Sequence, residues 1–269
     1  MPSTRAPVDL KALLGLARRA AAAGAAEHRR ARRATLDVGT KAGPSDLVTE
    51  VDRASEAAIV AAIRDARPDD SIIGEEGTSV AGASGLCWIL DPLDGTTNFV
   101  HGYPAHAVSV GVELDGKRLL GVVHDAYHDR VFSGIAGATA ECDGKPIAVR
   151  AETALAHALI GTGFLPDANV RRLQAEVLRH ILPQVRDVRR SGCPSLDLCA
   201  VASGALDGFY ECGLGRWDIA GGAAIAEAAG ARVLELDSPI LPAPLLVVAN
   251  TRLADALTSA LVDAGAAFG

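Results

Sequence analysis

The hydrophobic residues near the start of the chain recur at the spacing of an α-helix. Residues 8–33 carry leucines and alanines on one side and arginines on the other, which predicts a long amphipathic helix. A second helical pattern opens within residues 49–52 and is expected to end before Pro68, since proline lacks the amide hydrogen that a helix needs. We interpret the arginines at 29–33 as a solvated helix end, where cations are favoured near the unpaired carbonyl groups.

Shorter apolar runs follow, and their length and alternation are typical of strands. These runs lie at residues 71–73, 85–90, 107–114, 118–127 and 138–149. The third and fourth are joined by Asp115-Gly116-Lys117, and the fifth has Asp143-Gly144 at its centre. Asp-Gly between two alternating runs predicts a tight β-hairpin.

The second half of the chain alternates strand-like with helix-like segments. Strands are predicted at 158–164, 187–192, 205–212 and 245–250, and helices at 169–182, 194–204, 218–230 and after residue 250. Antiparallel hairpins followed by βα alternation predict a mixed α/β architecture with more than one sheet. With no linker or repeat, we expect one domain over residues 1–269, with an N-terminal α+β half at about 1–145 and a C-terminal α/β half at about 146–269.

Composition narrows the class of protein. Hydrophobic residues make up 49% and charged residues 22% of the chain, as in ordinary globular proteins. The net charge of −7 argues against a protein that binds nucleic acid through bulk electrostatics. No apolar run is long enough to span a bilayer, and five cysteines without a CxxC pair indicate free thiols in a reducing compartment. We therefore expect a cytoplasmic protein with neither a membrane nor a nucleic acid as its partner.

The dipeptide Asp-Gly occurs four times, and the first occurrence differs from the others. Asp115 and Asp143 lie between two strand patterns, and Asp207 leads into one. Asp94 lies in WILDPLDGTTNF, residues 88–99, which has a strand pattern only on its N-terminal side. An ordinary hairpin turn does not account for this stretch.

Its residues offer ligands for a hard metal ion. Pro92 is expected to end the strand just after Asp91, and Asp94 follows one tight turn later with the Leu93 carbonyl between them. Carboxylate and carbonyl oxygens suit Mg²⁺ better than zinc or copper. Taken alone, Asp91 and Asp94 are weak evidence for a metal site, and a capped turn would be the better explanation of them.

An anion site is predicted directly behind these acids. Gly95 allows a close backbone approach, and Thr96 and Thr97 offer hydroxyl and amide groups at the start of a short helix. A metal site beside an anion site is the requirement of phosphoryl chemistry.

Three further acids occupy similar settings. Glu75, followed by Glu76, comes directly after a predicted strand, Asp218 is placed at the N-cap of a helix, and Asp52 lies at a helix start. Each alone has a structural explanation as a cap or turn residue. Their combination with the Asp91–Asp94 motif favours a shared metal site.

These motifs also carry a resemblance. DLVTEVD (46–52), GEE (74–76), DPLDGTTNF (91–99) and WDIAGG (217–222) occur in the order and approximate spacing found in the inositol monophosphatase family, which belongs to the lithium-sensitive, magnesium-dependent sugar phosphatases. The resemblance covers roughly residues 10–260. It implies a layered αβαβα sandwich with two sheets, commonly a homodimer.

The resemblance also implies roles for individual residues. Mg²⁺ would be held by Glu75, Asp91, the Leu93 carbonyl, Asp94 and Asp218. Asp52, Glu75 and Thr96 would be catalytic, with Thr96 oriented by Asp52 to help activate water. The substrate would be bound by Lys41, Gly95, Thr96, Thr97, Glu211 and Asp218, with the amides of Gly95 and Thr96 on phosphate oxygens and Glu211 on substrate hydroxyls.

The implied activity is hydrolysis of inositol monophosphate or a similar small polyol phosphate. One departure from the family pattern, Cys193-Pro194, puts the sugar specificity in doubt, because Pro194 has no amide hydrogen to offer a substrate. Histidinol phosphate and fructose 1,6-bisphosphate are the alternative substrates within the superfamily. The alternative of another class is a non-enzymatic regulatory binding protein on the same fold.

Overall fold

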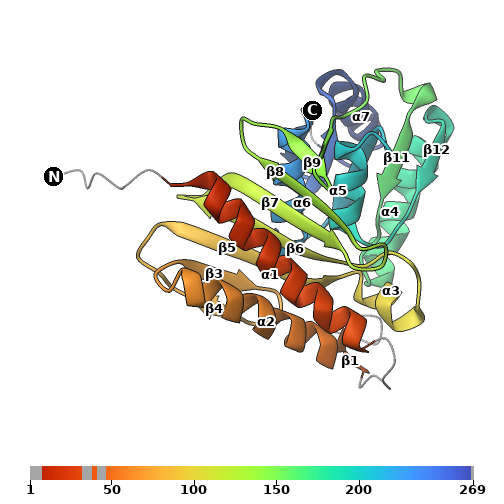
Figure 1. The fold of residues 1–269 in the computed structure, drawn as a ribbon. Coiled ribbons are helices and arrows are strands. Elements are labelled where there is room, and N and C mark those ends of the chain that lie inside the picture. Colours follow the sequence, from red (N-terminus) through yellow and green to blue (C-terminus); the bar gives the residue numbers. More distant parts are fainter. Residues whose placement is uncertain (1–7, 32–37, 41–46, 268–269) are drawn as a thin grey trace.

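The computed structural model describes residues 8–31, 38–40 and 47–267. Two long helices, α1 (Leu10–Ala31) and α2 (Glu50–Ala66), pack against each other and form the first layer (Figure 1). Both were predicted at these places. The short strands β1 (Val38–Thr40) and β2 (Leu47–Thr49) pair with each other just before α2.

An eight-stranded sheet lies under the two helices. Its strands are β3 (Ser71–Gly74), β4 (Ser79–Val80), β5 (Leu86–Asp94), β6 (Ala107–Leu114), β7 (Lys117–Asp125), β8 (Arg130–Ile135), β9 (Ala140–Cys142) and β10 (Lys145–Ile147). They are arranged in the order β10-β9-β8-β7-β6-β5-β3-β4, and the β3–β5 pair is parallel whereas the other pairs are antiparallel.

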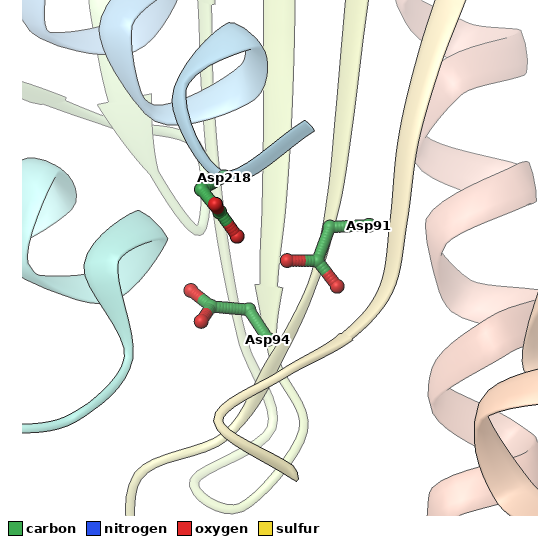
Figure 2. Close-up of side chains that lie close together, drawn as sticks. All are labelled: Asp91, Asp94 and Asp218. Carbon is green, nitrogen blue, oxygen red and sulfur yellow. The ribbon is translucent and has the colours of Figure 1, made fainter. Parts of the chain in front are cut away.

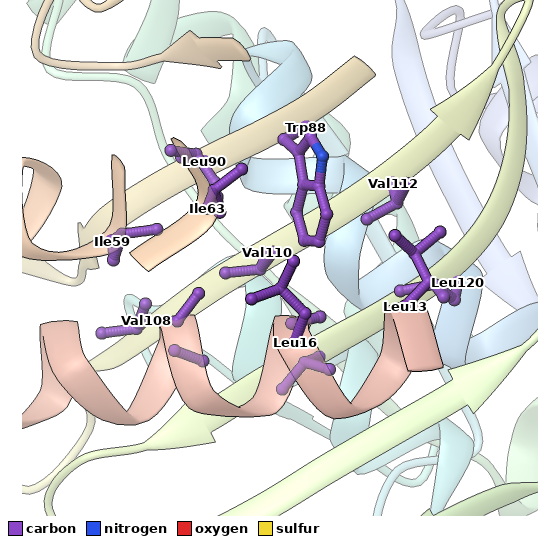
Figure 3. Packing of buried hydrophobic residues seen from close by; sticks show 14 of the residues in the cluster. Leu13, Leu16, Ile59, Ile63, Trp88, Leu90, Val108, Val110, Val112 and Leu120 are labelled. Atoms are coloured by element: carbon purple, nitrogen blue, oxygen red, sulfur yellow. The ribbon is translucent and has the colours of Figure 1, made fainter. Parts of the chain in front are cut away.

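Apolar side chains fill the space between the first helices and this sheet. Leu13 and Leu16 of α1 and Ile59 and Ile63 of α2 belong to one buried cluster with Trp88 of β5 (Figure 3). Trp88, Ile59 and Ile63 are fully buried. The cluster therefore fixes α1 and α2 relative to β5, the strand that leads into the Asp91–Asp94 motif.

Two small-residue helices form the middle layer. α5 (Pro194–Ala202) and α6 (Arg216–Ala228) pack against each other, and α6 crosses the large sheet. Close contact requires glycine at the crossing: a Cβ atom built on Gly121 would lie 2.1 Å from the carbonyl oxygen of Gly221. This crossing brings the N-terminal turn of α6 to the end of β5.

A second, five-stranded sheet and an outer pair of helices complete the layers. The sheet has the order β12-β11-β13-β15-β14, formed by β11 (Leu159–Thr162), β12 (Asp187–Arg189), β13 (Gly208–Cys212), β14 (Arg232–Leu236) and β15 (Leu245–Ala249). The outer helices are α4 (Ala168–Ile181) and α7 (Thr251–Asp263). Short helices are α3 (Thr96–His101), η1 (Leu155–His157) and η2 (Leu182–Gln184).

The mixed α/β prediction with more than one sheet is confirmed. The strands β8 and β14 and the short strands β1, β2 and β4 were not predicted. No helix in the described ranges has the length and apolar character needed to cross a membrane.

Candidate active site

The end of β5 is irregular, and this irregularity determines where its two aspartates point. Asp91 pairs with Ser109 and Asp94 with Ala107, so three residue steps on β5 match two steps on β6. The extra residue is a β-bulge. In a regular strand, residues three apart point to opposite faces, whereas the bulge lets both carboxylates approach the same point.

The prediction that Pro92 ends the strand was wrong. Strand pairing resumes at Asp94, because Pro92 lies inside the bulge, where its missing amide hydrogen costs no ladder bond. The bulge is held locally by Asp91, whose Oδ1 accepts a hydrogen bond from the Leu93 amide at 3.0 Å.

Asp218 reaches the same place from α6. The prediction that it caps this helix at its N-cap was wrong: the helix starts at Arg216, Gly215 is the N-cap, and Asp218 occupies the third helical position. From there its Oδ2 accepts a hydrogen bond from the Gly215 amide at 2.6 Å, which satisfies one of the unpaired amides of the helix start.

Asp91, Asp94 and Asp218 form a compact group of carboxylates. One oxygen from each lies within 4.8 Å of the other two, and the side chains converge on one point (Figure 2). Oδ2 of Asp91 is buried and accepts no hydrogen bond from any described residue. An unpartnered carboxylate oxygen surrounded by other carboxylates is a geometry that a cation stabilises.

The electrostatics of the group favour the binding of a positive charge. Burial, followed by the charges of Glu75, Asp94 and Asp218, raises the pKa of Asp91 well above its ordinary value. Burial and then the charges of Asp94 and Glu75 raise the pKa of Asp218 to about 7. Burial raises the pKa of Asp94 to about 6, although hydrogen bonds from Ser195 and Cys193 oppose the shift. A hard divalent ion such as Mg²⁺ fits this all-oxygen set.

Glu75 lies beside the group. It follows β3, its amide donates to the Leu90 carbonyl at 3.1 Å, and its charge raises the pKa of Asp91. It is not one of the three residues whose oxygens all lie within 4.8 Å. A metal ion between Glu75 and Asp91 would relieve this repulsion.

The Thr96 side chain contacts Asp52, with which the resemblance pairs it, and also Leu93. The Thr96 hydroxyl lies 3.1 Å from Oδ1 of Asp52 and 3.0 Å from the Leu93 carbonyl oxygen. Gly95 precedes α3 with a φ of 86°, a left-handed conformation that glycine adopts without strain. Thr97 is exposed on the first turn of α3.

Of the predicted substrate-binding residues Glu211 and Lys41, the structure describes only Glu211. Glu211 is buried on β13, and burial, Asp197 and Asp218 raise its pKa. A Cβ atom on Gly163 would lie 2.1 Å from both carboxylate oxygens of Glu211, so any larger residue there would displace this carboxyl group. Lys41 lies outside the described residues.

Sequence reasoning missed two donors to Asp94. The Cys193 thiol donates to Oδ2 of Asp94 at 3.1 Å, and the Ser195 amide donates to the same oxygen at 2.7 Å. Both flank Pro194, the first residue of α5. The signal available was the segment SGCPS, residues 191–195, in which a cysteine and a serine flank the proline.

A buried histidine was also missed. His28, near the C-terminal end of α1, is fully buried, and its Nε2 lies 2.8 Å from the Pro92 carbonyl oxygen. Its ring contacts Phe99 and His106. Four arginines follow His28 within residues 29–33, and such a composition predicts an exposed helix end, so the sequence does not indicate that His28 is buried.

Comparison with known proteins identifies the family. Residues 9–266 match the inositol monophosphatase family, and the chain belongs to it. The chain is 43% identical over 234 residues to the inositol-1-monophosphatase SuhB of Mycobacterium tuberculosis, covering 83% of this chain and 81% of that protein. It is 39% identical over 224 residues to the Nus factor SuhB of Pseudomonas aeruginosa, covering 80% and 83%.

Solved structures agree with the layered fold. The extragenic suppressor protein suhB of Bartonella henselae superposes with a TM-score of 0.87 at 32% identity, covering 93% of this chain and 98% of that one. The Mycobacterium tuberculosis SuhB structure gives 0.82 at 36% identity, covering 97% and 99%. The predicted sandwich of inositol monophosphatase type is therefore confirmed.

Proposed function

We propose that this protein is a Mg²⁺-dependent phosphomonoesterase that hydrolyses inositol monophosphate or a similar small polyol phosphate. The observation that carries the proposal is the convergence of Asp91, Asp94 and Asp218 around an unpartnered buried oxygen. Membership of the inositol monophosphatase family supports it.

The metal ligands in this proposal are Glu75, Asp91, the Leu93 carbonyl, Asp94 and Asp218. When bound, Mg²⁺ supplies positive charge that neutralises the phosphate ester and lowers the pKa of a coordinated water. The protein contributes the fixed positions of the carboxylates. Asp91 and Asp94 are held by the bulge, and Asp218 by its bond to the Gly215 amide.

Thr96 and Asp52 are proposed to orient the attacking water, with Glu75 nearby. If the Thr96 hydroxyl donates to Asp52, 3.1 Å away, its lone pairs are left to accept a hydrogen bond from water. Asp52 is buried on α2 and so fixes the direction of this hydroxyl. The water is thereby aligned for attack on the phosphorus atom.

The substrate is proposed to lie between the acids and β13. The amides of Gly95 and Thr96 would donate hydrogen bonds to phosphate oxygens, helped by Thr97 and Lys41, while Asp218 and Glu211 would face the sugar. Burial and the nearby acids raise the pKa of Glu211, so this residue is protonated over a wider pH range than an ordinary glutamate, and the protonated form both donates to and accepts from a hydroxyl.

A phosphate-release panel tests the proposal. The esters are inositol 1-phosphate, histidinol phosphate, fructose 1,6-bisphosphate and adenosine 3′,5′-bisphosphate, each with Mg²⁺, with EDTA, and with Mg²⁺ plus lithium. We expect fastest release from the inositol ester, none with EDTA, and inhibition by lithium. Fastest release from another ester would correct the substrate, and no release from any would overturn the activity.

A variant pair localises the activity. Asp94→Asn should abolish most turnover, whereas Asp207→Asn should retain it. Asp207 is the matched control because it too is a buried aspartate before glycine, but its Oδ2 accepts from the Leu159 amide at 2.8 Å, away from the acid group. Equal activity in both variants would contradict the site.

A second candidate function is a non-enzymatic binding role, because a relative at 39% identity is named a Nus factor. Under this alternative a partner protein would be retained in EDTA and by Asp94→Asn, with no phosphate release from the panel. The predicted homodimer is tested separately by sedimentation.

A further inference from the structure

One face of α2 carries three buried polar residues that contact three different segments. Asp52, Ser55 and Glu56 lie three and four residues apart, the spacing of one helix face, and are 0%, 0% and 5% exposed. Buried polar side chains need partners, so what they contact reveals their role. Asp52 contacts Thr96, as described above.

Glu56 holds the turn that carries Glu75. Its Oε2 accepts from the Glu76 amide at 2.9 Å, and its Oε1 accepts from the Thr78 amide at 3.0 Å and the Thr78 hydroxyl at 2.6 Å. A Cβ atom on Gly74 would lie 2.2 Å from Oε2, so glycine allows the carboxylate this close. The backbone on either side of Glu75 is thus shaped around Glu56.

Ser55 and His28 hold the bulge between Asp91 and Asp94. The Ser55 hydroxyl donates to the Pro92 carbonyl at 2.7 Å, and Nε2 of His28 lies 2.8 Å from the same oxygen. A carbonyl only accepts, so Nε2 carries the ring proton. A Cβ atom on Gly24 of α1 would lie 2.7 Å from the Ser55 hydroxyl oxygen, so glycine at that position leaves Ser55 its room.

We propose that Glu56, Ser55 and His28 are positioning residues for the metal ligands: they hold the Glu75 turn and the Asp91–Asp94 bulge on one helical framework. This inference rests on the proposed function, in which those acids bind Mg²⁺. Carboxylates as close together as those of this acid group repel one another, so the segments that bear them would separate unless their backbone is anchored. The anchors hold the backbone of these segments and do not themselves bind the carboxylates that would hold the ion.

Metal affinity without substrate distinguishes this role from a purely structural one. In Glu56→Gln the side chain keeps its size, but its amide nitrogen cannot accept from the Glu76 amide. We expect Mg²⁺ affinity, measured by calorimetry, to fall about tenfold or more, as for other groups that orient metal ligands. The Mg²⁺ concentration for half-maximal phosphate release should rise in parallel.

Asp70→Asn is the matched control. Asp70 is also a buried carboxylate close to α2, where it accepts from the Trp88 indole at 2.8 Å and from Arg67, remote from the acids. It should lower the free energy of unfolding without changing Mg²⁺ affinity. A similar loss of stability in Glu56→Gln with unchanged Mg²⁺ affinity would overturn the role of Glu56.

The two donors to Pro92 give a second test, which stands if Glu56→Gln fails to fold. Ser55→Ala and His28→Phe each leave one donor in place, and phenylalanine keeps the ring packing of His28. We expect each single variant to lose about threefold in Mg²⁺ affinity. The double variant should lose more than the product of the two single losses, because Ser55 and His28 both bind the Pro92 carbonyl oxygen. Unchanged affinity in the double variant would overturn the role of this pair.

Failure of the inference differs from failure of the proposed function. A wild-type protein that binds Mg²⁺ but hydrolyses none of the four esters defeats the function, while the calorimetric comparison still decides the positioning roles. An active enzyme whose variants bind Mg²⁺ as the wild type does defeats the inference alone.

Discussion

The dipeptide Asp-Gly occurs in a hairpin turn at Asp115-Gly116 and in the acid group at Asp94-Gly95, and the two places differ in conformation and burial. At Asp115-Gly116, both residues have positive φ, 49° and 78°, and the turn is exposed between β6 and β7. At Asp94-Gly95, only the glycine has positive φ, and Asp94 is buried at 4% exposure beside two other carboxylates. A hairpin aspartate acts through its backbone conformation, whereas Asp94 is suited to act through its charge.

The largest effect expected from this comparison is on turnover. Asp94→Asn should lower kcat by about a hundredfold or more, because the amide supplies one neutral oxygen in place of a charged ligand. Asp115→Asn should leave kcat unchanged, since asparagine also tolerates positive φ. Steady-state phosphate release, with circular dichroism as the control for folding, measures both. A reversed order would remove the distinction between the two dipeptides.

A pH-dependent effect on stability is expected next. The raised pKa values of Asp94 and Asp218, about 6 and about 7 against an ordinary 3.8, mean that the folded metal-free protein binds more protons than the unfolded chain. Their contribution to stability is therefore complete below about pH 4 and is lost as the pH rises through 6 and 7. Mg²⁺ should restore more stability at pH 8 than at pH 5.

Urea unfolding in EDTA at pH 5 and pH 8 measures this contribution. The free energy of unfolding of Asp94→Asn, relative to that of the wild type, should be higher at pH 8 than at pH 5, because the substitution removes one of the repelling charges. Asp115→Asn should show no such change. A constant difference between Asp94→Asn and wild type at both pH values would contradict the electrostatic account.

A smaller effect is expected at Cys193. Cys193→Ala removes one of two donors to Oδ2 of Asp94 and leaves the Ser195 amide, so we expect roughly a three- to tenfold loss of kcat. Cys193→Ser should recover part of it, because serine also donates. Mg²⁺ titrations of phosphate release compare the variants. Equal loss in both would assign the effect to packing of the buried thiol.

The smallest effect on activity is expected at the second hairpin. Asp143 has a φ of 50°, and its Oδ1 accepts from the Val131 amide at 2.8 Å. Asp143→Ala should lower the free energy of unfolding by about 1 to 2 kcal/mol through strain and the lost hydrogen bond. Turnover should be unchanged. Reduced kcat at full stability would show that hairpin and site are coupled.

Much of the fold was predictable because its signals are local. The stripe of α1, the opening of α2 and the two Asp-Gly hairpins each depend on residues adjacent in the chain. The site was predictable as a set of acids, through their motifs. The geometry of the site was not predictable from local sequence. It depends on a bulge between Asp91 and Asp94, and this bulge arises from the pairing of β5 with β6, which residues near Asp91 in the chain do not determine.

The sequence by itself determined the turns, the helix stripes and the identity of the acids, since these follow from backbone preference and side-chain chemistry. Tertiary structure alone decided that Asp218 meets Asp91, that Cys193 donates to Asp94, and that Glu56 and Ser55 reach two different loops from one helix face. The physical reason is that burial, mutual repulsion and hydrogen-bond partners depend on distances between segments that only packing sets.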